Sequence, residues 1–151
     1  MRLALYQPDI PQNLGAAIRL AACLATPLDI VEPCGFPLTN RALKRAALDY
    51  GPHAQIARHD GLASFRAALL GRLVLIETDG GVRLHDFAFT QTDTIALGRE
   101  SAGSSLELAA AADAIVRIPM AAGLRSLNVV TAAAVALSEA MRQTGGFERL
   151  T

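Results

Sequence analysis

Short apolar runs alternate along the chain with segments whose apolar residues recur every three or four positions. The runs predict β-strands and the longer periodicity predicts helices. We expect strands at 2–6, 28–31, 55–58, 73–77, 94–97 and 115–118, and helices at 14–25, 39–48, 62–70, 106–111 and 129–143. This alternation predicts an α/β fold, a largely parallel sheet with helices on both faces. No linker or repeat interrupts it, so we expect a single domain, 1–151.

The last helix is unusually apolar, because residues 129–137 are Val, Ala and Leu almost without interruption. A helix that is apolar nearly all round is normally buried, so we predict that it lies in the core. Pro119 ends the strand before it, and Arg125, Ser126 and Asn128 form a polar group at its start. Locally, Ser126 is interpreted as an N-cap and Arg125 as a solvated charge. The alternative is a ligand site at the helix start, where backbone N–H groups are unpaired.

The first helix offers a similar choice. Asn13 is a plausible N-cap, and Leu14, Ile18, Ala21 and Ala22 would form its buried face. In the same local interpretation Arg19 is a surface charge.

The second helix carries a basic face. Thr39 could cap it, and Arg41, Lys44 and Arg45 follow at spacings that place them together. Such a face is usually only solvated, but it is also the best local candidate for binding phosphate.

Composition narrows the function classes. With 14 basic and 14 acidic residues the formal net charge is zero, so nucleic acid is not held by bulk charge and any contact must come from local patches. Aromatic residues make up 5% and tryptophan is absent, which argues against an RNA-binding sheet with stacking rings.

The spacing of the cysteines, histidines and carboxylates along the chain matches no common disulfide, metal or acid-pair motif. Cys23 and Cys34 lack CxxC spacing and are expected to be reduced thiols of a cytosolic protein. The three histidines share no metal-ligand spacing, so no metal site is expected, and the Asp and Glu residues form no obvious acid pair. The first residues are too briefly apolar for a signal peptide and no segment approaches a membrane span, which predicts a soluble cytoplasmic protein.

Ligands of parallel sheets bind beyond the carboxyl ends of the strands. Four loops there are candidates: 8–13, 78–81, 98–105 and 120–128. The loop 98–105 reads GRESAGSS, in which two glycines allow a sharp bend or a close approach to a ligand. It is neither a GxGxxG fingerprint nor a P-loop.

Three sequence runs are informative when taken together and in order: LYQPDIPQNLGAAIR (5–19), LGRESAG (97–103) and IPM…RSLN…EAMRQ (118–143). Together they resemble the three motifs of the SPOUT class of RNA methyltransferases, most closely the short, single-domain TrmL (YibK-like) branch. The run VEPCGFPLTNRALKRAALDY (31–50) is also similar to that branch, so the resemblance covers nearly the whole chain.

The resemblance implies a deep C-terminal trefoil knot that binds S-adenosylmethionine, in a homodimer with sites completed across the interface. Arg19 of one subunit would face the cofactor of the other. The implied catalytic residues are Arg19, Asn13, Glu100, Ser126 and Asn128. The implied cofactor-binding residues are Ile76, Thr78, Gly80, Leu97, Gly98, Glu100, Gly103, Ile118, Met120, Ser126 and Leu127. Arg19, Arg41, Lys44, Arg45 and Arg125 are the implied tRNA contacts.

The activity implied by the resemblance is methylation of the ribose 2′-hydroxyl at the tRNA wobble position, a cytidine or modified uridine, in leucine tRNAs. Alternatives are the same chemistry at another tRNA or rRNA position, or a catalytically silent RNA-binding or assembly protein. Because a guanidinium is always charged, Arg19 suits phosphate clamping and electrostatic stabilisation better than proton abstraction.

The chain departs from the family pattern at three places. Ser104-Ser105 stand where Leu-Pro is frequent, Val130-Thr131 where Ser-Asn is common, and Ser138 where an aromatic residue often precedes Glu-Ala. All lie outside the residues assigned to catalysis.

Overall fold

The computed structural model describes residues 1–150. Seven strands form one sheet in the order β3-β2-β1-β6-β4-β7-β5, and every ladder is parallel. The strands are β1 (Arg2–Tyr6), β2 (Leu28–Val31), β3 (Ile56–His59), β4 (Leu73–Ile76), β5 (Val82–Arg83), β6 (Thr94–Leu97) and β7 (Ala114–Arg117). The helices are α1 (Pro11–Cys23), α2 (Asn40–Ala47), α3 (Leu62–Ala67), α4 (Leu106–Ala111) and α5 (Val129–Thr144), with short 3₁₀ turns η1 (Leu48–His53), η2 (Leu84–Asp86) and η3 (Gly146–Arg149). The expected parallel α/β architecture is confirmed.

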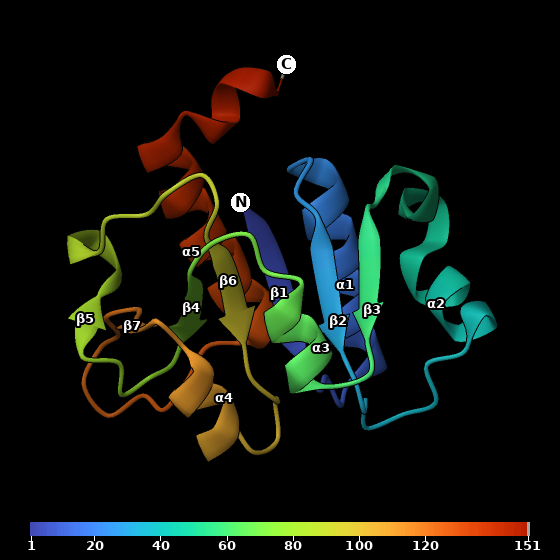
Figure 1. Ribbon diagram of the computed structural model, residues 1–151, viewed down its shortest axis with the longest axis horizontal. Helices are drawn as coiled ribbons and strands as arrows, with labels where there is room; N and C mark the ends of the chain where they lie inside the picture. Colours follow the sequence, from blue (N-terminus) through green and yellow to red (C-terminus); the bar gives the residue numbers. More distant parts are fainter. Residues whose placement is uncertain (151) are drawn as a thin grey trace.

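Helices cover both faces of the sheet, and alternate residues of each strand point to opposite faces. In β1, Leu3 and Leu5 join the core beneath α1 and α5, whereas Ala4 and Tyr6 join the core beneath α3 and α4. Figure 1 shows α3 and α4 on the near face of the sheet, with α1 and α5 behind it and α2 beside α1. Strands buried on both faces read as continuous apolar runs, which explains why they are visible in the sequence.

The start of α1 corrects the sequence prediction. The helix begins at Pro11, and its N-cap residue Ile10 makes no side-chain capping bond. Proline suits the first helical position because the N–H that it lacks has no partner there. Asn13 therefore lies inside the first turn and its side chain bonds elsewhere. Ala22 is only partly buried.

The last helix differs from its prediction in two ways. Its N-cap is Asn128, whose Oδ1 accepts hydrogen bonds from the N–H groups of Val130 and Thr131 (2.9 and 3.3 Å), so Ser126 is not the cap. Only one face is buried: Leu137 is fully enclosed, but Val135 is 40% exposed. The prediction that this helix is buried all round is wrong for the single chain.

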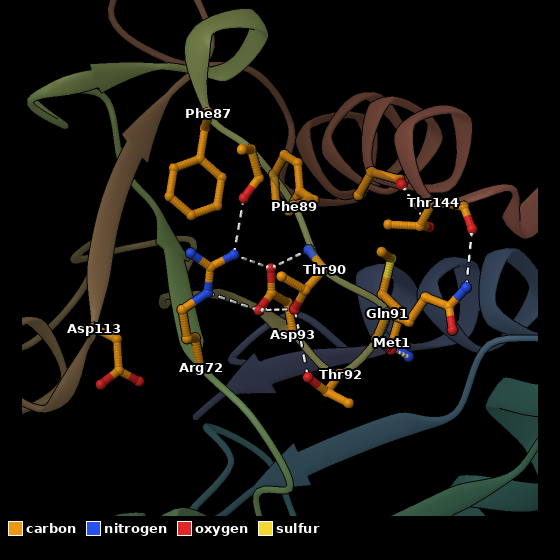
Figure 2. Close-up of polar contacts among 12 residues, drawn as sticks. Met1, Arg72, Phe87, Phe89, Thr90, Gln91, Thr92, Asp93, Asp113 and Thr144 are labelled. Atoms are coloured by element: carbon orange, nitrogen blue, oxygen red, sulfur yellow. Dashed lines mark hydrogen bonds and ion pairs between the residues drawn. The ribbon is translucent and has the colours of Figure 1, made fainter.

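A buried carboxylate ties β4 to the loop before β6. Asp93 is fully enclosed and accepts two bonds from Arg72 (2.9 and 2.7 Å) and two from Thr90, one from the backbone N–H and one from the hydroxyl (both 2.8 Å). Arg72 also donates to the carbonyl of Ala88 and stacks on the ring of Phe87, as Figure 2 shows. This network fixes the base of the strands whose far ends carry the site.

Among residues 1–150, no helix is long and apolar enough to cross a membrane.

Candidate functional site

The loops that follow β4, β6 and β7, together with the starts of α1 and α5, enclose a cavity of about 470 Å³. It lies beyond the carboxyl ends of the strands, where parallel sheets bind ligands. The cavity is lined by Ile10, Asn13, Ile76, Glu77, Thr78, Leu97, Gly98, Arg99, Glu100, Gly103, Ile118, Met120, Arg125, Ser126, Leu127, Asn128, Val129 and Ala132.

The structure gathers nearly all of the expected cofactor-binding residues at this cavity. Those in its lining are Ile76, Thr78, Leu97, Gly98, Glu100, Gly103, Ile118, Met120, Ser126 and Leu127. Gly80 is not among them. A Cβ at Gly80 would lie 2.6 Å from the carbonyl carbon of Val116, so this glycine allows close packing against β7.

The loop after β6 is folded tightly on itself. Arg99 and Gly103 exchange two backbone hydrogen bonds (3.1 and 2.8 Å), and Gly103 has φ +68°, a conformation that glycine adopts without strain. A Cβ at Gly98 would lie 2.4 Å from Ser104 Oγ. The two glycines are therefore required by the turn itself.

A chain of amide and carboxyl groups joins the three motifs. Asn13 Nδ2 donates to Glu100 Oε1 (3.1 Å), and Asn128 Nδ2 donates to Asn13 Oδ1 (3.1 Å). Three implied catalytic residues, far apart in sequence, thus form one hydrogen-bonded row along the cavity wall. Ser126 lines the same cavity.

Two carboxyl groups meet beside this row, so the expectation of no acid pair is wrong. Asp9 N–H donates to Glu100 Oε2 (2.9 Å), and the two carboxyl groups lie close enough for each to shift the pKa of the other. Burial, and then the neighbouring Asp9 carboxyl, raises the pKa of Glu100. The neighbouring Glu100, and then the bond from the Ser101 hydroxyl, lower the pKa of Asp9 to about 2.

Glu77 links two of the loops. Its Oε1 accepts from the N–H of Ser104 (2.8 Å), and its Oε2 from the N–H of Thr78 (3.3 Å). Sequence reasoning missed Glu77, Asp9 and Arg99 at this site. Their position in the loops that follow strands of a parallel sheet was the signal that could have found them.

Arg19 lies elsewhere, in a groove of about 900 Å³ between α1 and α2 that Arg45 also lines. Its guanidinium sits 4.7 Å from the centre of the Tyr50 ring. Arg41 and Lys44 are exposed on α2, outside the lining of this groove. Arg125 is exposed at the cavity. The implied tRNA contacts therefore fall in two places within one chain.

Cys23 and Cys34 are free thiols. Within the described part of the chain, no three His, Cys, Asp or Glu side chains gather in a group that could hold a metal ion.

Comparisons with known proteins find relatives that match nearly the whole chain. The model of the SpoU rRNA Methylase family matches residues 1–138. A tRNA (cytidine(34)-2′-O)-methyltransferase from Ancylobacter novellus is 51% identical over 152 residues, covering 99% of this chain and 96% of that protein.

Two solved structures are also similar. One, concerning the 2-OH methylation of C/U34 on tRNA, is 42% identical with a TM-score of 0.87, covering 94% of both chains. The other is the SpoU methyltransferase AviRb from Streptomyces viridochromogenes with its cofactor AdoMet; it is 28% identical with a TM-score of 0.80, covering 95% of this chain and 60% of that one. The fold, the cavity between the three motifs and these matches lead to one conclusion: the chain belongs to the SpoU rRNA methylase family.

Proposed function

We propose that the protein transfers a methyl group from S-adenosylmethionine to the ribose 2′-hydroxyl of nucleotide 34 of tRNA, a cytidine or modified uridine. The observation that carries this proposal is the 51% identity, over 99% of the chain, to a tRNA (cytidine(34)-2′-O)-methyltransferase. The family's own name refers to rRNA. The similarity to the tRNA enzyme is the more specific guide, because it extends over nearly the full length of both proteins.

The cavity suits S-adenosylmethionine in size and lining. Pockets for ligands of this size usually measure about 300–1,000 Å³ and are mostly apolar with a few polar groups. Ile76, Leu97 and Ile118 provide apolar walls, and Glu100, Arg125 and Ser126 provide polar groups. The buried hydroxyl of Ser104, in the loop that borders the cavity, has no protein partner among the described residues. When bound, S-adenosylmethionine supplies a methyl group on a sulfonium that is already electrophilic.

The chain's own residues must position the ribose hydroxyl for reaction with the methyl group. A guanidinium does not release its proton at physiological pH, so we assign Arg19 to holding the phosphate beside the reacting ribose and orienting its hydroxyl. The row of Asn13, Glu100 and Asn128 would keep the three motif loops in register around the cofactor.

We further propose that the active unit is a homodimer. Arg19 does not line the cavity of its own chain, so the arginine that faces each cavity would come from the partner subunit. The half-exposed face of α5 supports this proposal, since Val135 is apolar and 40% exposed.

The C-terminal segment is proposed to form a deep trefoil knot. Support comes from the sheet order: β7 lies between β4 and β5, although it follows both in sequence. The chain therefore leaves the sheet from an internal strand and continues through residues 118–128, which line the cavity, into α5. Leucine tRNAs as substrates and the cytoplasm as compartment complete the proposal.

Mapping ribose methylation in total tRNA tests the activity. Cells with and without this gene are compared, and loss of 2′-O-methylation at position 34, restored by the unchanged protein, is expected. Loss at another tRNA or rRNA position would replace the substrate assignment. No change at any position, together with no S-adenosylmethionine binding by calorimetry, would indicate a silent RNA-binding protein instead.

A further inference from the structure

Asp9 has no part in the chemistry proposed above, yet the fold brings it against Glu100 at the cavity's edge. β1 and β6 are parallel neighbours with Leu5 opposite Leu97, so the residues that follow them meet at the same edge of the sheet. Asp9 comes from the first of these loops and Glu100 from the second. The contact joins the start of α1 to the 98–103 loop, which carries several cavity-lining residues.

The contacts of Asp9 are incomplete without a proton. Its Oδ2 accepts from the Ser101 hydroxyl and lies 3.7 Å from Arg99 Nε. Its Oδ1 is buried with no hydrogen-bond donor among the described residues. A buried carboxylate oxygen without a donor is costly, and native structures rarely leave one. A proton on the neighbouring Glu100 carboxyl would supply that donor.

We propose that Asp9 is a positioning residue that shares one proton with Glu100, and that this proton holds the 98–103 loop against the start of α1. The inference rests on the proposed function, because it takes S-adenosylmethionine as the ligand of the cavity. Asp9 would act through Glu100 and the loop.

The charged surroundings allow one negative charge in the pair but not two. Arg99 is the cation that contacts Asp9, at 3.7 Å, and Asn13 offers Glu100 a neutral amide. Cys34 lies nearby but is neutral, because burial and then Glu32 raise its pKa to about 11. The other charged groups around the cavity are Glu77 and Arg125, one of each sign.

The opposite pKa shifts of Asp9 and Glu100 indicate which of the two carboxyl groups holds the proton. Burial and the contact with Asp9 raise the pKa of Glu100, while the pKa of Asp9 falls to about 2, so the shared proton resides on Glu100. The bridge is complete below the raised pKa of Glu100. It is lost as pH rises through that pKa, because two adjacent carboxylates then repel each other. The 98–103 loop would separate from α1 and the cofactor would bind less tightly.

Calorimetric titration of the protein with S-adenosylmethionine tests this inference. The pH series runs upward from about 4.3, the ordinary value for a glutamate carboxyl, so that it begins below the raised pKa of Glu100. The affinity of the unchanged protein should fall about tenfold, the effect of one lost hydrogen bond to a charged group. Asp9→Asn should bind with a nearly constant affinity, because its amide donates to an ionised Glu100 at every pH. Asp9→Ala should bind about tenfold more weakly even at low pH.

Ser101→Ala is the matched control. It removes the other side-chain bond to Asp9 but leaves the shared proton, so it should keep the fall in affinity. Titration of the ligand's own groups affects all variants alike, and circular dichroism at each pH checks that each is folded. Equal pH profiles for the unchanged protein and Asp9→Asn would overturn the inference while leaving the proposed function intact. A complete failure of the unchanged protein to bind would instead count against the proposed function.

Discussion

Arg19 is held by an aromatic ring. Among residues 1–150 no carboxylate pairs with it, and its guanidinium lies 4.7 Å from the centre of the Tyr50 ring. A cation–π contact at an exposed site contributes about 0.5–1 kcal/mol. It orients the planar group and leaves its N–H edge available for a phosphate. For an arginine proposed to bind RNA phosphate, an aromatic ring is a better partner than a carboxylate, because a carboxylate would compete with the phosphate for the guanidinium.

Replacing Arg19 separates turnover from cofactor binding. Arg19→Ala is expected to reduce methyl transfer by about a hundredfold or more, as loss of a positioned charge usually does, while calorimetry shows unchanged affinity for S-adenosylmethionine. Tyr50→Phe, which retains the ring, is the control that should keep most activity. Turnover of Arg19→Ala equal to that of the unchanged protein would refute its assigned role.

The buried Asp93 is expected to matter for stability rather than activity. Asp93→Ala removes four hydrogen bonds (Figure 2) and should cost about 3 kcal/mol of unfolding free energy, or about 6–12 °C in Tm for a chain of this length. Asp86→Ala, at an exposed pair with Arg83, should change stability by less than about 0.5 kcal/mol. Thermal and urea unfolding measure both.

The stability that Asp93 contributes depends on pH in a defined direction. Burial alone would raise the pKa of this carboxyl, but the bonds from Arg72 and Thr90 outweigh burial and lower it below 3.8. The ionised form is therefore favoured by folding. Its contribution is complete above pH 3.8 and is lost as pH falls through the folded pKa. The stability difference between the unchanged protein and Asp93→Ala should narrow in acid, and a constant difference would contradict this account.

At the scale of elements, α2 is the clearest basic surface. The helix is capped by Thr39, whose Oγ1 accepts from the N–H of Ala42 (3.0 Å), as the sequence predicts. It contains Arg41, Lys44 and Arg45 and no acidic residue, and all three side chains are exposed. In a chain of zero net charge, such a helix is a local site where phosphates can bind.

Changing Arg41, Lys44 and Arg45 together to Gln should weaken tRNA binding without altering cofactor affinity. The slope of log affinity against log salt concentration should fall by about one for each phosphate contact removed. Filter binding at several salt concentrations measures this. A control that changes the ion-paired Arg58, Arg66 and Arg83 to Gln removes the same charge from other elements. Equal loss of tRNA binding in both variants would show that α2 has no special role.

The elements that periodicity predicted well are those with local signals. The strand 94–97 and the helix 106–111 have the bounds expected, the latter because Ser105 caps it through a bond from Leu108 N–H. The start of α1 was missed by three residues because no side chain caps it. The two-residue strand β5 is too short for any period to appear.

The candidate site also has a part that the sequence predicts and a part that it does not. The lining of the cavity could be anticipated from motif resemblance, since each motif places its residues in one loop. The contact between Asp9 and Glu100 could not, because the two residues are 91 positions apart and neither is unusual locally. Only the pairing of β1 with β6 brings them together.

For the whole molecule, the separation of Arg19 from the cavity is the main fact to explain. Figure 1 places α1 and α5 behind the same sheet, and α5 leaves Thr131, Val135 and Ser138 exposed. A two-fold dimer through this side would give both chains the same environment and could bring each Arg19 to its partner's cavity.

Mixing two inactive variants tests this arrangement. Arg19→Ala lacks the arginine, and Ser126→Trp should block the cavity. If each site uses Arg19 from one chain and the cavity from the other, mixed dimers contain one complete site. After subunit exchange at equal amounts, about a quarter of the unchanged activity should return, because half of the dimers are mixed and each has one of two sites. Both variants measured alone are the controls, and no recovery despite demonstrated exchange would argue for sites within one chain.

The side chain of Asn128 gives the molecule one further property. Its Oδ1 caps α5 and its Nδ2 holds Asn13 at the cavity wall. A ligand that draws the loops together would therefore also stabilise the first turn of α5. A more stable first turn would raise the affinity for the ligand by the same free energy, because the coupling between two equilibria is reciprocal. The gain in ligand affinity and the reduced fraying at the start of α5 would then both measure the same coupling free energy.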